Sequence, residues 1–199
     1  MRLDHLAIAS ETLAEGVAWA QDRLGVTFLA GGKHARFGTH NQLLGLADGL
    51  YLEVITVDPD AQSEGPRWFG LDEFSGPPRL TNWICEPDDF EAYMVHGMRK
   101  VPMARGNLRW DMGAPVDGSL PLGGAFPTVL RWHTDTPPGQ SLSASGCALR
   151  MLTIAHPKAD DIAAQLAGDL VDARIRFEVA EDVCLHAEIE TPTRGVVTL

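Results

Sequence analysis

Residues 2–9, RLDHLAIA, and residues 50–57, LYLEVITV, are the two stretches that decide the predicted fold. Both are short, apolar and rich in strand-forming residues, which is typical of buried strands. Side chains alternate between the two faces of a strand. One face of each segment therefore carries every second residue: Leu3, His5, Ala7 and Ala9 in the first, and Tyr51, Glu53, Ile55 and Val57 in the second. An imidazole and a carboxylate thus interrupt apolar stripes, and a buried carboxylate needs a hydrogen-bonding partner, a metal ion or water.

The residues between these strands predict a helix followed by two further strands. Thr12 begins a capping box, apolar residues then recur at helical intervals, and Gly25 closes the helix. We expect the two strands over residues 26–30 and 41–46. Residues 1–58 then form a β–α–β–β–β module.

The segment KHARFGTHN, residues 33–41, is unusually polar for a connection between two strands. Beside the flexible Gly38 it carries three side chains that form hydrogen bonds, Thr39, His40 and Asn41. A plain surface turn is the simplest interpretation of this composition. The same three residues are our candidates for binding a ligand from this loop.

The rest of the chain repeats the module twice, judged by pattern rather than by identity. Residues 80–135 form the second module and residues 136–199 a third, smaller one. Residues 59–79 form a linker or a lid that carries aromatic anchors. We expect one compact domain in all.

Strands and helices follow one another in the later modules as they do in the first. One helix is expected after Asp88 or Asp89, and another opens at Pro157. The remaining segments are predicted strands, over residues 79–86, 108–112, 128–133, 149–155, 175–179, 183–190 and 195–199.

Composition excludes several classes of function. The 199 residues carry 16 Lys and Arg against 27 Asp and Glu, and this net charge of −11 argues against a nucleic-acid surface. We find no run of about 18 apolar residues that predicts a membrane span, and the early Asp4 and His5 argue against a secretion signal. Cys85, Cys147 and Cys184 lack metal-site spacing and fit free thiols in a reducing compartment, so we expect a cytoplasmic protein.

Several of these segments resemble the glyoxalase-like proteins of the vicinal oxygen chelate superfamily. The resemblance is carried by LDHLAIA, GTHNQLLGL and YLEVITVDP in the first module, and by PRLTNW, ARGNLRW and FPTVLRW in the second. It covers nearly the whole chain. It implies an α+β fold in which paired βαβββ modules form a curled mixed sheet around a pocket, with helices on the outer face.

The resemblance also implies one divalent metal ion, held by His and Glu from the first and fourth strands of paired modules. His5 and Glu53 match that pair in the first module and suit Zn²⁺, Ni²⁺, Mn²⁺ or Fe²⁺. Aligning the second module with the first places Asn82 opposite His5 and Arg131 opposite Glu53. Asn82 is a weak ligand and Arg131 cannot be one, because it stays protonated.

Three interpretations of the site therefore remain open. A metal ion could take its third ligand from His40. It could instead take one from the third module, where His156 and His186 are available. In the third interpretation, which we favour, the pocket is metal-free, and the aligned residues of both modules form a hydrogen-bonded constellation for an anionic or polar ligand.

The resemblance implies a small oxygen-rich ligand, such as a hydroxycarbonyl, a diol or a carboxylate. His5 and Glu53 are the candidate catalytic residues, with Glu53 as a base whose pKa is raised by burial. Lyase or isomerase chemistry of the glyoxalase type is one hypothesis. The other is a protein that binds and sequesters a small molecule without turnover. Pairing of the modules within one chain or across a homodimer is left open.

Other residues have plainer interpretations. Glu53 could pair with an arginine such as Arg105 or Arg131 and only fix the sheet. Arg105, just before a predicted strand, is also a candidate to bind a carboxylate or a phosphate at the pocket mouth. His34 and His96 are expected to be exposed. The strand tryptophans are predicted core aromatics, any one of which could also form a pocket wall: Trp83, Trp110 and Trp132.

Overall fold

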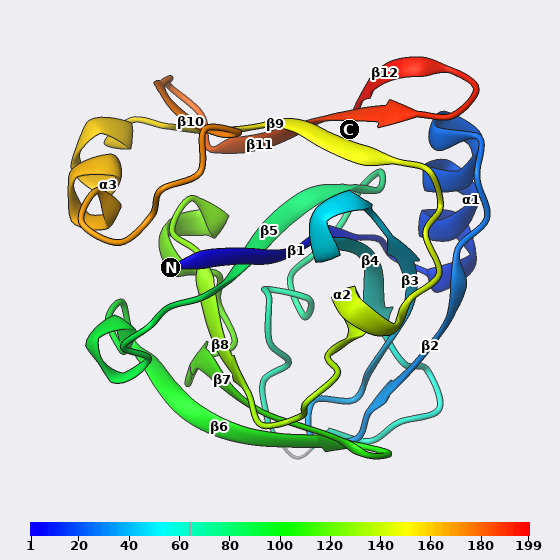
Figure 1. Cartoon of the computed structure of the whole chain (residues 1–199). Coiled ribbons are helices and arrows are strands. Elements are labelled where there is room, and N and C mark those ends of the chain that lie inside the picture. Colours follow the sequence, from blue (N-terminus) through cyan, green and yellow to red (C-terminus); the bar gives the residue numbers. More distant parts are fainter. Residues whose placement is uncertain (64) are drawn as a thin grey trace.

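The computed structural model describes residues 1–63 and 65–199. Over those residues the chain forms an eight-stranded sheet, with the strand order β2-β3-β4-β1-β5-β8-β7-β6, and a four-stranded sheet (Figure 1). The larger sheet curls, so that β2 and β6 at its two edges approach each other. This architecture confirms the predicted α+β fold with a curled mixed sheet.

The first half of the larger sheet is a β–α–β–β–β module. Its elements are β1 (Arg2–Ala9), α1 (Leu13–Leu24), β2 (Leu29–His34), β3 (Thr39–Gly45), the short 3₁₀ helix η1 (Ala47–Gly49) and β4 (Tyr51–Val57). Thr12 caps α1 through its hydroxyl, which accepts the backbone N–H of Glu15, and Gly25 closes the helix at φ 69°. Strand β1 pairs in parallel with β4.

The second half has the same strand order, but it runs across the sheet in the opposite direction. Its elements are β5 (Arg79–Glu86), η2 (Glu91–Tyr93), β6 (Met98–Arg105), β7 (Leu108–Pro115), η3 (Pro121–Gly124) and β8 (Thr128–Trp132). Strand β5 pairs in parallel with β8, as β1 does with β4. The antiparallel pair β1–β5 joins the two halves, so the modules pair within one chain.

The helix expected after Asp88 or Asp89 is wrong. Only the single turn η2 forms there, and the following residues His96 and Gly97 have φ values of 51° and 78°. Two successive left-handed residues cannot continue an α-helix. The chain instead enters β6, a strand that the pattern did not predict, at Met98.

The polar segment 33–41 is mostly strand rather than loop. Strand β2 extends to His34 and β3 begins at Thr39, so the turn between them is shorter than the sequence predicts. The ladder between β2 and β3 pairs His34 with Thr39 and Lys33 with His40. Polar composition misled the prediction because these strands are polar on a face that lines a cavity.

Strand β1 departs from simple alternation at Asp4. Across β5, Leu3 pairs with Cys85 and His5 pairs with Ile84, so Asp4 is the extra residue of a β-bulge. Leu3 consequently packs in the core between the two sheets. The prediction that Leu3 shares a face with His5 is therefore wrong.

The C-terminal segment forms the second sheet. After the short helix α2 (Pro138–Ser141), its elements are β9 (Ala148–His156), α3 (Ala159–Leu166), β10 (Ile175–Val179), β11 (Cys184–Thr191) and β12 (Gly195–Thr198). The order of elements along the chain matches the third predicted module, and α3 begins two residues after Pro157. The strand order β10-β9-β11-β12 differs from that of the first two modules, because α3 links two neighbouring parallel strands.

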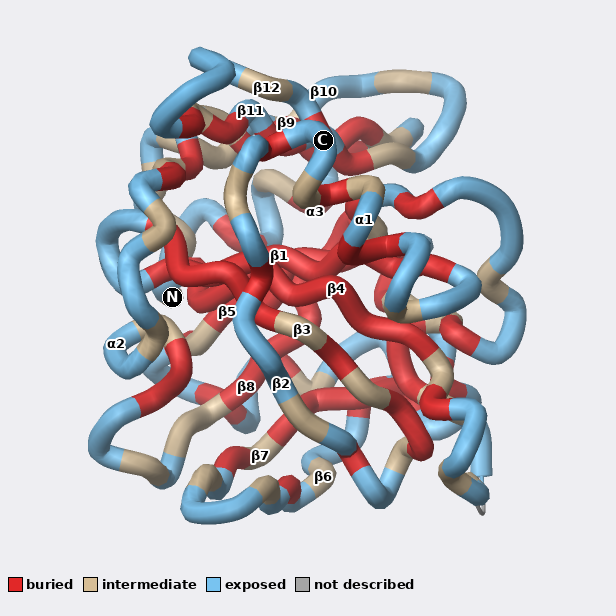
Figure 2. Tube along the Cα trace, turned by 90° about the vertical axis from the view of Figure 1, so that its right-hand side faces the viewer, coloured by how far each residue is buried: buried red, intermediate tan, exposed pale blue. Residues whose placement is uncertain are grey.

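Two apolar clusters organise the interior, and buried residues follow β1, β4 and β5 through the middle of the molecule (Figure 2). The larger cluster lies between the two sheets and includes Leu6, Trp83, Leu152 and Ile189. The smaller cluster lies inside the curl of the eight-stranded sheet and includes Ala7, Ile55, Met112 and Leu130. In the described chain, no helix is both long and apolar enough to cross a membrane.

Candidate functional site

A cavity of about 360 Å³, including its open mouth, lies inside the curl of the larger sheet. Its polar lining consists of His5, His34, Asn41, Tyr51, Glu53 and Arg105. Its apolar lining is largely aromatic and consists of Leu43, Trp68, Phe69, Trp110, Met112, Leu130 and Trp132. The first half of the sheet supplies all the polar groups except Arg105, which comes from β6.

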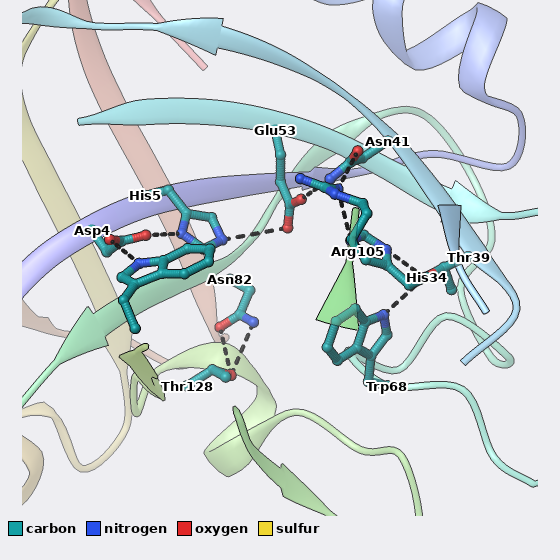
Figure 3. Close-up of polar contacts among 11 residues, drawn as sticks. Asp4, His5, His34, Thr39, Asn41, Glu53, Trp68, Asn82, Arg105 and Thr128 are labelled. Carbon is teal, nitrogen blue, oxygen red and sulfur yellow. Dashed lines mark hydrogen bonds and ion pairs between the residues drawn. The ribbon is translucent and has the colours of Figure 1, made fainter. Parts of the chain in front are cut away.

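The imidazole of His5 lies between two carboxylates. Its Nδ1 is 2.6 Å from Oδ1 of Asp4, and its Nε2 is 3.5 Å from Oε1 of Glu53 (Figure 3). The bulge at Asp4 makes the first contact available, because neighbouring side chains of a regular strand point to opposite faces. Burial lowers the pKa of His5, but the hydrogen bonds to Asp4 and Glu53 outweigh burial and raise the pKa to about 9. His5 is therefore an imidazolium at neutral pH.

Glu53 is a buried carboxylate with both oxygens engaged. Its Oε1 faces His5, and its Oε2 accepts a hydrogen bond of 2.7 Å from Nδ2 of Asn41. Burial raises the pKa of Glu53, yet the His5 contacts and the Asn41 bond outweigh it, so that the pKa is lowered overall. The expectation that burial raises the pKa of Glu53 overall is wrong, because a cation lies beside it.

Asn41 connects Glu53 to a cation at the other end of the cavity. Its Oδ1 accepts hydrogen bonds from the backbone N–H of Gly32 at 2.9 Å and from Nη1 of Arg105 at 3.2 Å. The same Arg105 nitrogen lies 3.1 Å from Nε2 of His34. Asn41 thus fixes the carboxylate and the guanidinium in one hydrogen-bonded row (Figure 3).

His34 must be neutral to hold Arg105. Its Nε2 accepts from the guanidinium, so its Nδ1 carries the proton and donates to Oγ1 of Thr39 at 3.1 Å. The same hydroxyl accepts a hydrogen bond of 3.0 Å from Nε1 of Trp68. Burial and the charge of Arg105 lower the pKa of His34 to about 4. The required tautomer and the lowered pKa therefore agree.

Four of the predicted site residues meet in the cavity: His5, Asn41, Glu53 and Arg105. The hydroxyl of Thr39 accepts hydrogen bonds from two residues that line the cavity, His34 and Trp68. His40 lies on the neighbouring position of β3, and it does not line the cavity in the described chain. Any part of these residues in binding a ligand stays a prediction.

The second-module residues lie elsewhere. Asn82 is fully buried, and its amide pairs with the hydroxyl of Thr128 at 3.0 Å, apart from the row that contains His5 (Figure 3). Arg131 donates to the backbone oxygen of Asp88 and lies over the ring of Phe90. The module alignment predicts that Arg131 faces Glu53 across the cavity, and this prediction is wrong. Its neighbour Leu130 takes the inward position, because side chains alternate along β8.

Sequence reasoning missed two polar members of the site. His34 is buried and lines the cavity, so the expectation that it is exposed is wrong. The sequence pattern assigns Asp4 no place in the site, yet its carboxylate contacts Nδ1 of His5 and accepts a hydrogen bond of 2.9 Å from Nε1 of Trp132. The pairing of β2 with β3 and the bulge in β1 decide these positions, and neither leaves a local signal in the sequence. Trp68 and Phe69, two aromatic residues of the segment predicted as a linker or a lid, line the cavity.

The residues present do not fit a divalent metal ion. Among residues 1–63 and 65–199, no three His, Cys, Asp or Glu side chains are grouped so as to hold one. His5 and Glu53 are the two potential metal ligands that meet. Asn41 links Glu53 to the positively charged Arg105, which would repel a metal ion. His156 and His186 lie on β9 and β11 of the other sheet. No step of the chemistry is therefore assigned to a metal ion.

Gly31 gives a direct test of the Asn41 connection. A Cβ atom at Gly31 would lie 2.2 Å from Oδ1 and 2.4 Å from the backbone oxygen of Asn41. Gly31→Ala is expected to destabilise the protein by about 2 kcal/mol in urea unfolding, because Asn41 must move away from Glu53. Gly168→Ala is the control, since a Cβ there meets nothing within 4 Å. Equal stability of the two variants would contradict the packing described.

The fold and the cavity define a class of protein. Two four-stranded halves, the first a complete βαβββ module and the second with the turn η2 in place of its helix, curl around a cavity in the manner of the vicinal oxygen chelate superfamily, which confirms the resemblance seen in the sequence. A family model described as a glyoxalase-like domain matches residues 3–170. The chain belongs to this family of glyoxalase-like domains.

Solved structures add the fold alone. A hypothetical protein from Staphylococcus aureus is 14% identical, with a TM-score of 0.66 over 96% of this chain and 91% of that chain. Methylmalonyl-CoA epimerase from Mycobacterium tuberculosis is 21% identical, with a TM-score of 0.43 over 66% of this chain and 86% of that chain. The comparison with curated proteins gives no match.

Proposed function

We propose that the cavity binds a small oxygen-rich molecule that carries a carboxylate, and that Glu53 and His5 act on it as a base and an acid. The observation that carries this proposal is the state of Arg105. Its Nη1 is fixed by His34 and Asn41, whereas Nε and Nη2 have no hydrogen-bond partner within the described residues. A guanidinium held in this way can donate two parallel N–H bonds, from Nε and Nη2, to an anion. The two oxygens of a carboxylate match that geometry.

The rest of the cavity suits a carbonyl group next to that carboxylate. The Nε2–H of His5 is the donor that would stabilise negative charge on the carbonyl oxygen, in a site walled by aromatic rings. Glu53, ionised at neutral pH, would accept a proton from the carbon beside the carbonyl. The electron pair of the broken C–H bond then moves into an enolate. Return of the proton to another carbon is isomerase chemistry, and loss of a β-substituent is lyase chemistry.

A second candidate is binding without turnover. It is favoured by the two contacts of Glu53, because a carboxylate that is already paired with His5 and Asn41 and has a lowered pKa is a weak base. In this alternative the whole polar row is a recognition surface. Exchange of substrate protons with solvent separates the two candidates.

The binding step is tested with 2-oxobutanoate, a small acid with adjacent carboxylate and carbonyl groups. Arg105→Met is expected to weaken its binding, measured by calorimetry, about 10- to 100-fold, because a charge-assisted bidentate contact is lost. Arg99→Met is the matched control, since Arg99 is an exposed arginine of the same strand. The proposal fails if 2-oxobutanoate and related small oxygen-rich acids do not bind, or if the two variants bind equally well.

A further inference from the structure

A second, larger cleft lies beside the cavity, where the two sheets meet α1. It measures about 1050 Å³, including its open mouth. Its walls are largely apolar side chains from α1, the segment 69–81, η3 and its approach, β11 and the C-terminus, among them Trp19, Phe74, Leu80, Leu120, Leu185 and Leu199. Charged side chains, Glu73 and Arg79, occur along the same lining. The site described above makes no use of this cleft.

Phe69 is a wall of both spaces. It lines the cavity of His5 and Glu53, and it also lines the cleft between the sheets. Phe69 and Gly70 have φ values of 62° and 65°, a conformation that a phenylalanine rarely adopts. The ring of Phe69 stacks on that of Trp68 at 4.6 Å and 7°.

The left-handed turn at Phe69 is held in place rather than free. The backbone N–H of Gly70 donates to the oxygen of Gly118 at 2.8 Å. Trp68 is fixed from the other side by its hydrogen bond to Thr39 and by stacking on Phe37 at 4.3 Å. Backbone strain of this kind persists only where the surroundings impose it, and it is concentrated at ligand-binding segments. The side chain of Phe69, in contrast to its backbone, has cavity space on two sides.

We propose that the cleft receives the apolar arm of a ligand whose carboxylate and carbonyl groups lie in the His5–Glu53 cavity, with Phe69 as the gate between them. The inference rests on the proposed function and narrows the ligand to an acid with a hydrocarbon tail. Rotation of one aromatic side chain connects the two spaces without any change of the sheets. The apolar walls of the cleft then bury the tail, while the head keeps its contact with Arg105.

Chain length is the variable that tests this inference. 2-Oxooctanoate has the same head as 2-oxobutanoate and four additional carbons. Burial of four methylene groups is expected to lower the dissociation constant on the order of 100-fold, measured by calorimetry on the wild-type protein. Equal binding of the two acids would overturn the tail site and leave the head site intact. Failure of both acids to bind would instead overturn the proposed function.

A cysteine in the cleft reports where the tail lies. Cys184 lines the cleft and is partly exposed, whereas Cys85 and Cys147 are buried. Saturating 2-oxooctanoate is expected to slow the alkylation of Cys184 by iodoacetamide at least fivefold, followed by intact mass, while saturating 2-oxobutanoate leaves the rate unchanged. Equal rates with the two acids would contradict a tail in this cleft.

A polar substitution in the wall of the cleft completes the test. Leu120→Gln is expected to remove most of the advantage of the longer acid and to leave the binding of 2-oxobutanoate unchanged, because Leu120 does not line the cavity. Val196→Gln on the exposed face of β12 is the control and should retain the advantage. If both variants retain it, the tail lies elsewhere and the inference is overturned.

Discussion

The wild-type protein is expected to lose stability in alkaline solution, and Asp4→Asn is expected to reduce that loss. In the folded protein the pKa of His5 is about 9, against about 6.5 in an unfolded chain. The folded state therefore holds this proton more tightly. Its contribution, on the order of 3 kcal/mol, is complete below about pH 6.5 and disappears as the pH rises through 9. Without the Asp4 carboxylate, the pKa of His5 falls and the alkaline slope falls with it.

The surroundings of His5 make Asp4 the informative choice. Glu53 faces the other ring nitrogen, and Tyr51 stacks on the imidazole at 4.3 Å. Burial raises the pKa of Tyr51 well above its ordinary value, so Tyr51 stays neutral in the pH range of the experiment. An asparagine keeps one oxygen that can accept the hydrogen bond of Trp132, and it replaces the charged oxygen that faces His5 by an amide nitrogen.

The measurement is urea unfolding between pH 6 and 10, with the resonances of the His5 ring followed by NMR in parallel. Asp88→Asn serves as the control, because the side chain of Asp88 is fully exposed. It should retain the alkaline loss of stability. A wild-type protein whose stability does not fall between pH 7 and 10 would show that His5 is not held as an imidazolium.

Glu53→Gln is expected to slow the exchange of the C3 protons of 2-oxobutanoate with D₂O by about 10²- to 10⁴-fold, the usual contribution of a positioned general base. The amide has nearly the same shape, so binding measured by calorimetry should change far less than exchange. Proton NMR of the acid follows the exchange directly. The difference between the two readouts assigns a proton-transfer role to the carboxylate, beyond a role in packing.

A matched control and a clear negative outcome accompany this experiment. Glu188→Gln alters an exposed carboxylate of the second sheet and should exchange protons at the wild-type rate. A wild-type protein that binds 2-oxobutanoate yet exchanges no protons above the rate in buffer would contradict the catalytic role of Glu53. It would support the binding protein without turnover.

The sequence predicts strands β1 and β4, because both are short, apolar segments. It also points to His5 and Glu53, because each of them interrupts an apolar face of its strand. His5 and Glu53 do meet in the cavity, as the pattern of β1 and β4 predicts. The same alternation places Leu3 on the wrong face. The bulge at Asp4 moves the residues before it to the opposite face of the strand, and composition does not reveal a bulge.

The second half of the site was harder to predict from the sequence. Counting residues from the start of each module assumes equal spacing, and that assumption placed Arg131 in the cavity. The true charge there is Arg105, which lies at the end of β6, a strand hidden by an apparent helical period. His34 and Arg105 belong to opposite edges of the eight-stranded sheet, and only the curl brings them together. Contacts of that kind depend on tertiary geometry alone.

The two halves of the curled sheet contribute different kinds of side chain to the cavity. Strands β1 to β4 provide the acid, the imidazoles and the amide, whereas β7 and β8 provide the rings and the hydrocarbon that face them. Except at Trp132, whose Nε1 donates to Asp4, substitutions on β7 and β8 would therefore reshape the chamber without disturbing the titrating groups. Diversification within the family could proceed by substitutions on one side of the chamber, which alter its shape and preserve the polar groups on the other side.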